Sequence, residues 1–424
     1  MRFKFLWPTV LVCVCALLVF FGWHRFSAQR RQLPPEQPPV LLTQTAPAAS
    51  MVTAATQDFG FRLFGQLTQG QSGNVVVSPT SISLALSMTY NGAAGSTATG
   101  MAKALGITKL SQAALNQGQA ALIASLQHGD PQVTLAIANA LWAQQQYQFR
   151  ADYLQRVQQS YQAKVATTNL ASPVGAKLIN DWVTEQTRGK IAGIAPPQGF
   201  DPNARLVLTD ALYFKGQWTQ AFSKGLTETE DFTLANGGKT RVPMMARTGH
   251  YPYFETPDFQ AIGLPYGASN RFEMLVFLPK AGKTLAGLGK SLDAQHWQQW
   301  MRQFKIANCE LKLPRFTTAY TTHLETPLSQ LGMADAFSDR ANFSGMTGNT
   351  ELYISQVLHQ TRIEVNEEGT EAVAVTTVVT TAKDVAVMVQ PIPVIIDHPF
   401  FFAIRDKATG ALLFMGQIVN PQGL

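Results

Sequence analysis

The stretch EEGTEAVAVTTVVTTA, residues 367–382, decides how the fold of this chain is interpreted. From Ala372 to Ala382 it holds no proline, glycine or charged residue, and residues 376–381 are all β-branched, which favours a β-strand. Proteins normally keep such a segment from the surface, because it pairs with other strand edges. Its flanks are nevertheless charged, with glutamates before it and Lys383-Asp384 after it. The segment is therefore either an ordinary buried strand or a strand held outside a sheet that it could join.

The alternation of side chains supports the second interpretation. Side chains of a strand point in turn to opposite faces. One face carries only small or medium uncharged residues, namely Thr370, Ala372, Ala374, Thr376, Val378, Thr380 and Ala382. Such a face could slide between two strands, and Gly369 supplies a backbone hinge that a side chain would restrict.

Composition and cysteine usage describe a globular protein without a disulfide framework. The chain has 424 residues, of which 46% are apolar and 14% charged, so a large core is possible. Its net charge of +6 lies partly at the N-terminus and does not indicate an acidic partner. Cys13 and Cys15 lie in the N-terminal apolar run, which leaves Cys309 alone in the body. A lone cysteine at the start of an apolar strand is typical of packing and not of a nucleophile.

Residues 1–31 are interpreted as a signal anchor or a signal peptide. Arg2 and Lys4 precede the unbroken apolar run of residues 10–21, and Trp7 and Trp23 bracket that run as interfacial aromatic residues do. Cleavage signals near the run are poor, which favours an uncleaved anchor. We expect an extracytoplasmic protein, periplasmic or extracellular, that is membrane-anchored or secreted.

The rest of the chain divides into a linker and one domain. Five prolines in residues 32–50 predict an extended spacer, and residues 51–424 show no second break in composition and no repeat. Helices are expected over residues 56–67, 78–90, 111–127 and 176–186. Strands are expected over residues 74–77, 205–214, 272–278, 309–313 and 411–419. This mixture without regular alternation predicts the α+β class.

No constellation of residues predicts an enzyme. The chain has no G-x-S-x-G elbow, no H-E-x-x-H motif and no phosphate-binding glycine loop. Its seven histidines are far apart, so we expect no metal site, and nothing indicates a cofactor. Basic residues are scattered and not clustered with aromatic ones, which argues against nucleic-acid binding.

Ordered motifs in the body carry a resemblance to a known family. NVVVSP (74–79), LTDALYFKGQW (208–218), DHPFFF (397–402) and FMGQIVNP (414–421) are among them. From Met51 onward the chain resembles the serpins, the serine-protease-inhibitor family, over essentially its whole length. The resemblance implies the serpin fold, in which three β-sheets and a surrounding set of helices present an exposed reactive-centre loop.

The resemblance also implies a mechanism and a set of site residues. A protease cuts the loop and is held as a covalent acyl-enzyme, while the cut loop inserts into the central sheet. The hinge that matches the inhibitory pattern consists of Glu367, Glu368, Gly369, Thr370, Ala372 and Ala374. The positions where the loop enters the sheet, called the breach, match Trp218 and Arg315, and Arg315 is expected to pair with Glu367. The hydrogen-bonded cluster beneath the sheet, called the shutter, matches Ser78, Ser81, Asp210 and His359.

Two counts along the loop place the reactive bond differently. Counting forward from Glu367 by the family's spacing gives Lys383-Asp384, and counting back from Pro399 gives Met388-Val389. We prefer the forward count, because the inserted length must suit the sheet. Lys383 would suit trypsin-like proteases, whereas residues 386–389 would suit elastase- or subtilisin-like ones.

Asp210 departs from the family, which usually has asparagine there. If Asp210 touches His359, an ion pair replaces a neutral amide hydrogen bond, so Asp210→Asn should change the pH dependence of spontaneous loop insertion. The helix expected over residues 111–127 has no lysine or arginine, so we expect no heparin-like activator to bind there.

The expected partners are a target serine or cysteine protease and, through the N-terminal segment, a membrane, with the protein acting as a monomer. Two other functions stay open. A non-inhibitory serpin would be cut as a substrate and serve in binding or as a chaperone. A membrane-tethered binding module would not use the loop at all.

Overall fold

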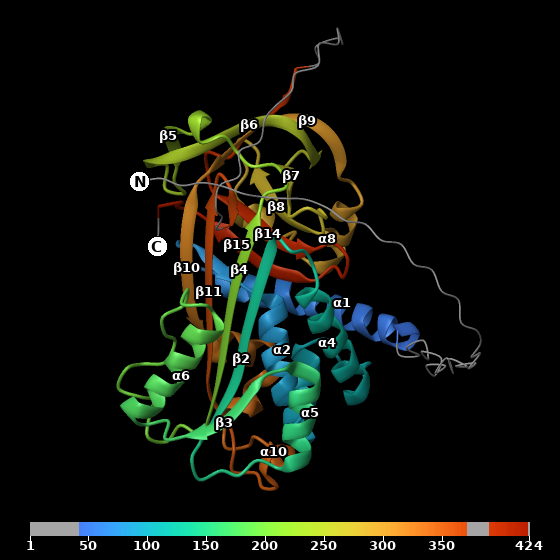
Figure 1. The fold of residues 1–424 in the computed structure, drawn as a ribbon, viewed down its shortest axis with the longest axis vertical. Coiled ribbons are helices and arrows are strands. Elements are labelled where there is room, and N and C mark those ends of the chain that lie inside the picture. Colours follow the sequence, from blue (N-terminus) through green and yellow to red (C-terminus); the bar gives the residue numbers. More distant parts are fainter. Residues whose placement is uncertain (1–41, 371–389, 423–424) are drawn as a thin grey trace, which may run out of the picture. The chain divides into compact units, whose positions relative to one another are not determined.

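Two β-sheets dominate the part of the chain that the structure describes (Figure 1). The structure is a computed structural model that describes residues 42–370 and 390–422, with side chains from Pro47 onward. The predicted N-terminal targeting segment, Ala372, Ala374 and both candidate reactive bonds lie outside the described residues. Within the described ranges, no helix combines the length and apolar character that a membrane crossing needs.

The helices and strands have the following bounds. The helical segments are α1 (Leu42–Thr68), α2 (Pro79–Tyr90), α3 (Gly95–Ala104), α4 (Gln112–Gln127), α5 (Ala151–Tyr161), α6 (Pro173–Gln186), η1 (Lys224–Leu226), α7 (Leu285–Gly289), α8 (Ala294–Met301), α9 (Glu325–Leu328), η2 (Ser329–Met333), η3 (Ala334–Phe337) and α10 (Ser344–Thr347). The strands are β1 (Val75–Val77), β2 (Val133–Gln144), β3 (Lys164–Thr168), β4 (Leu206–Gln217), β5 (Glu228–Thr233), β6 (Lys239–Glu255), β7 (Phe259–Tyr266), β8 (Phe272–Pro279), β9 (Lys305–Pro314), β10 (Phe316–His323), β11 (Ile354–Asn366), β12 (Gly369–Thr370), β13 (Ile392–Ile395), β14 (Phe400–Asp406) and β15 (Leu412–Ile418).

One sheet has six strands in the order β10-β11-β12-β4-β2-β3, and the other has nine. The three sheets expected from the family resemblance are present as two hydrogen-bonded ones, because the long strand β6 belongs to two of them. Its first part pairs with β5 and β9, and its last residues, Tyr253–Glu255, pair with β7. The α+β architecture is as predicted.

Strand β4 is buried on both faces, which explains its nearly continuous apolar sequence. Val207 and Ala211 pack with α6 residues in one cluster, whereas Leu206 and Leu208 pack in the main core with α2 residues. The alternation puts Asp210 on the same face as Leu206 and Leu208. A charged residue is thereby placed in the middle of the sheet, on the side of α2.

Most predicted elements are confirmed, with one correction at the N-terminal end. The helix expected over residues 56–67 begins at Leu42, so residues 42–50, predicted as part of an extended spacer, are helical. Alanines at 46, 48, 49, 54 and 55 favour this helix, and Pro47 lies in its second turn, where it removes a single backbone donor. The helix therefore reaches into the proline-containing segment.

Candidate functional site at the hinge

The chain reverses direction between β11 and β12 in a tight turn. Asn366 Oδ1 accepts hydrogen bonds from the backbone N–H groups of Glu368 (3.0 Å) and Gly369 (3.2 Å). Gly369 has a φ of +144°, and a Cβ atom there would lie 2.1 Å from the carbonyl oxygen of Gly216. Only glycine fits this position, because a side chain would meet both backbone strain and the neighbouring strand.

Strand β12 lies between β11 and β4 at one end of the six-stranded sheet. Gly369 and Thr370 pair with Gln217 and Gly216 on one side and with Asn366 and Val365 on the other. Farther along, β11 and β4 pair directly with each other in parallel, from Ile354 with Leu206 to Arg362 with Tyr213. The sheet is thus open at one end, with the first residues of a new strand between its two central strands, and closed at the other.

Thr370 points into the protein and is 1% exposed. Its hydroxyl group is 2.9 Å from the hydroxyl of Tyr266, which is fully buried. The Tyr266 ring stacks on Trp218 with a centroid distance of 4.3 Å and an interplanar angle of 14°. Trp218 and Tyr266 therefore form an aromatic surface at the point where β12 lies in the sheet, and Tyr266 supplies a hydroxyl partner for Thr370.

Backbone hydrogen bonds hold the turn against this aromatic surface. Trp218 Nε1 donates to the carbonyl oxygen of Asn366 (2.9 Å), and its backbone N–H donates to that of Glu368 (2.9 Å). The N–H of Phe222 donates to the carbonyl oxygen of Glu367 (2.7 Å). Trp218, which the family resemblance placed at the loop entry, thus contacts the turn through both its ring and its backbone.

A basic side chain forms an ion pair with each of the two glutamates of the turn. Glu367 is 2% exposed, forms an ion pair with Arg315 and accepts a hydrogen bond from Thr227 Oγ1 (2.7 Å). Glu368 pairs with Lys224 at 2.6 Å. Burial by itself would raise the pKa of Glu367, but the hydrogen bonds from Arg315 and Thr227 outweigh it and lower that pKa below its usual value. Glu367 is therefore held as a carboxylate at the hinge.

The shutter residues meet on the inner face of the sheet. His359 Nδ1 is 2.6 Å from Asp210 Oδ1, and its Nε2 accepts the N–H of Ser78 (3.1 Å). Ser81 donates its hydroxyl to Asn139 Oδ1 (3.1 Å). Because Nε2 is an acceptor, the ring proton lies on Nδ1 and is donated to Asp210. Within the described residues, Asp210 Oδ2 has no hydrogen-bond partner, although the whole side chain is buried.

The sequence did not indicate all residues of the site. Tyr266, Thr227 and Lys224 contact the hinge, yet nothing in their local sequence distinguishes them, because their positions follow from the pairing of distant strands. Cys309 is buried, as predicted, and this burial raises the pKa of its thiol to about 11, which disfavours the thiolate of a nucleophile. No metal-binding group of three or more histidine, cysteine or acidic side chains occurs among the described residues.

Comparisons with known proteins agree on one family. The family model described as serpin, serine protease inhibitor, matches residues 54–421. An uncharacterised serpin-like protein of Thermococcus kodakarensis is 38% identical over 88% of this chain and 86% of its own length. The leukocyte elastase inhibitor of Bos taurus is 34% identical over 87% of this chain and 99% of its own length. The crystal structure of tengpin, a thermophilic serpin in the native state, matches with a TM-score of 0.80 at 31% identity, covering 88% of this chain and 94% of tengpin.

Proposed function

Because the chain belongs to the serpin family, whose members are protease inhibitors and not enzymes, we propose that it inhibits a protease as a suicide substrate. A protease cuts a bond within the loop that follows β12 and is trapped as an acyl-enzyme. The cut loop then inserts between β11 and β4. The observation that carries the proposal is the position of β12, which already lies between these two strands.

The register of β12 defines a path for the rest of the loop. Thr370 faces inward, so a strand that continues from it turns Ala372, Ala374 and Thr376 inward as well. Glu371 would fall on the opposite face, where its charge stays in water. The small uncharged face recognised in the sequence is therefore the face that would enter the protein.

Continuing the same register brings Thr376 opposite both Asp210 on β4 and His359 on β11. These two residues are direct neighbours before insertion, and an entering strand must separate them. The buried Asp210–His359 contact thus lies across the insertion path and acts as a lock.

The length of the open path favours one reactive bond. In this register β4 begins opposite Thr380 and β11 begins opposite Thr381, so the sheet accepts the loop up to these residues. Cleavage at Lys383-Asp384 leaves a strand that fills the sheet, whereas cleavage at Met388-Val389 leaves a surplus beyond it. We therefore propose Lys383-Asp384 as the bond that yields inhibition.

Insertion is favourable because each entering residue pairs on two sides. The newly paired residues 371–381, about eleven at roughly 3.3 Å each, would move the bound protease by about 36 Å. New ladder hydrogen bonds at about 0.5–1.5 kcal/mol each would contribute on the order of 10 kcal/mol in total. That figure rivals the stability of a whole domain, so the uncut protein is metastable.

The test is incubation with trypsin-, elastase- and subtilisin-like proteases, followed by denaturing gel electrophoresis and mass spectrometry of the released C-terminal peptide. We expect a covalent complex with a trypsin-like protease and a peptide that begins at Asp384. Thr370→Arg puts a charge on the inserting face and should turn the protein into a substrate. The matched variant Glu371→Arg, on the other face, should still form the complex. Cleavage of the wild type without any complex would instead support the non-inhibitory alternative.

We also propose that the protein acts outside the cytoplasm, exported or anchored by residues 1–31. The basic residues followed by an apolar run in this segment support the proposal. Fractionation of cells that express the full chain, compared with a chain that begins at residue 32, tests it.

A further inference from the structure

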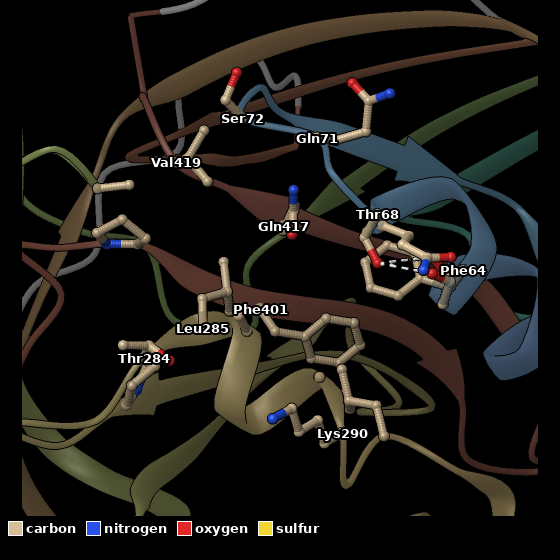
Figure 2. A pocket seen from close by; sticks show the side chains of 18 of the residues that line it. Phe64, Thr68, Gln71, Ser72, Thr284, Leu285, Lys290, Phe401, Gln417 and Val419 are labelled. Atoms are coloured by element: carbon tan, nitrogen blue, oxygen red, sulfur yellow. Dashed lines mark hydrogen bonds between the residues drawn. The ribbon is translucent and has the colours of Figure 1, made fainter.

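A cavity of about 730 Å³ lies at the C-terminal end of α1, apart from the hinge (Figure 2). Its walls come from α1, α7, the segment before β14 and the end of β15. The volume is in the range of pockets that hold drug-sized ligands. None of the hinge, breach or shutter residues lines it, so the proposed inhibitory mechanism leaves this cavity without a role.

The walls are mainly apolar and aromatic. Phe64 and Phe401 meet edge to face with ring centroids 5.5 Å apart, and Leu285 and Val419 lie nearby in the view of Figure 2. Phe61 and Leu292 add further apolar surface. Phe61, Phe64 and Phe401 are themselves almost fully buried, so the water that an apolar ligand body would replace lies against half-buried side chains such as Leu285 and Val419.

The polar groups of the cavity are biased towards positive charge. Of the described residues that line it, Lys283, Lys290 and His398 are basic and none is acidic. Lys283 is paired with Asp258 at 2.6 Å. In the described part of the chain Lys290 has no ion-pair partner, and Figure 2 shows it at the end of the cavity beyond the Phe401 ring. Lys290 can therefore take an anionic ligand group without losing another contact.

His398, like Lys283, is already paired with a carboxylate. Its Nδ1 is 2.7 Å from Asp397 Oδ1 and its Nε2 is 2.7 Å from the carbonyl oxygen of Pro279. Both partners are acceptors, so both ring nitrogens carry a proton. The hydrogen bond to Asp397, followed by that to Pro279, raises the pKa of His398 despite its partial burial.

A glycine in the last turn of α1 keeps the cavity open. Gly65 lines it, and a Cβ atom at this position would have no neighbour within 4 Å. Alanine would fit there and would favour the helix, because glycine is a poor helix former. Packing therefore does not require glycine at this position, whereas a larger side chain would occupy the cavity.

From this geometry we propose that the cavity binds a small amphipathic anion, with an aromatic or aliphatic body against Leu285 and Val419 and an acidic group near Lys290. A matched pair of fluorescent probes separates the two features. Anilinonaphthalene sulfonate has the anionic group, and N-phenylnaphthylamine has the same rings without charge. Both are titrated into the folded full chain.

We expect the anionic probe to bind the wild type more tightly than the neutral one. Lys290→Met should weaken the anionic probe by about fivefold and leave the neutral probe unchanged, because one cation is lost from a partly screened site. Gly65→Phe should weaken both probes, and Lys103→Met on α3, outside the cavity, should weaken neither. Thermal unfolding of each variant establishes that it is folded.

Three results would overturn the proposal: no binding of the anionic probe to the wild type, equal effects of Lys290→Met on both probes, or unchanged binding of both probes by folded Gly65→Phe. Because none of these variants touches the hinge, covalent complex formation with a protease should be the same in all of them.

Discussion

Glu367 is the residue on which the charge of the hinge depends. It is buried, paired with Arg315 and bonded to Thr227, so its carboxylate stabilises the turn that precedes β12. We expect Glu367→Gln to lower the free energy of unfolding by about 1–2 kcal/mol at pH 7, because the half-exposed arginine limits the loss. Chemical denaturation measures this value.

The same variant has a defined pH dependence. The pKa of Glu367 is lower in the folded protein than in the unfolded chain, so its contribution is present above about pH 4.5 and is lost as the pH falls through the folded value. The difference between wild type and Glu367→Gln should therefore shrink in acid. Exposed Glu185→Gln is the control and should change little at either pH. A difference that grows in acid would contradict the assignment.

Gly369 is the residue that lets β12 enter the sheet. A methyl group there would lie 2.1 Å from the carbonyl oxygen of Gly216. We expect Gly369→Ala to displace β12 and to slow insertion after cleavage, so that more inhibitor molecules are consumed per protease molecule inhibited. Titration of protease activity measures this ratio. Gly65→Ala, which meets no neighbour, should leave the ratio unchanged. Equal ratios for the wild type and Gly369→Ala would refute this role.

Asp210 determines the charge of the lock across the insertion path. Insertion must separate its carboxylate from His359, and an asparagine would present a neutral amide in the same volume. We expect Asp210→Asn to change the rate of spontaneous loop insertion, because the hydrogen bond that insertion must break no longer ends on a carboxylate. Heat-inactivation rates measure it. Identical rates for both proteins would rule out the role of the carboxylate.

At the scale of elements, α4 predicts the response to polyanions. The helix contains no lysine or arginine along Gln112–Gln127. We expect heparin to leave the rate constant of inhibition unchanged, because polyanions bind to clustered basic side chains. Stopped-flow measurement with and without heparin tests this. A large acceleration that substitutions within α4 abolish would contradict it.

The elements also show what the sequence could predict. The helix at 111–127 and the strand at 272–278 were predicted close to their observed bounds, because an alanine- and glutamine-rich composition marks the first and a largely apolar run marks the second. The start of α1 was wrong, since prolines before Ser50 indicated a spacer and the alanines among them favour a helix. Tyr266 could not be found, because its contact with Thr370 depends on a register between distant strands. The pairing of Arg315 with Glu367 came from the family resemblance and not from local pattern.

At the scale of the whole molecule, the central claim is that the uncut fold lies above its lowest free energy. Strand β12 separates β11 from β4 at one end of the six-stranded sheet, and residues 371–382 have the sequence pattern of a strand that could continue it. Cleavage of the loop would release the constraint that keeps the strand out. In the proposed mechanism, the stability gained on insertion would drive the trapping of a protease.

The most direct test is calorimetric unfolding of the intact protein and of the protein cut within residues 371–389. A gain on the order of 10 kcal/mol predicts that the midpoint of the cut form rises by roughly 10 °C or more. The variant Thr370→Arg, cut in the same way, should show little or no rise. If the cut wild-type protein unfolds at the same temperature as the intact one, insertion stores no energy and the proposed inhibitory mechanism is wrong.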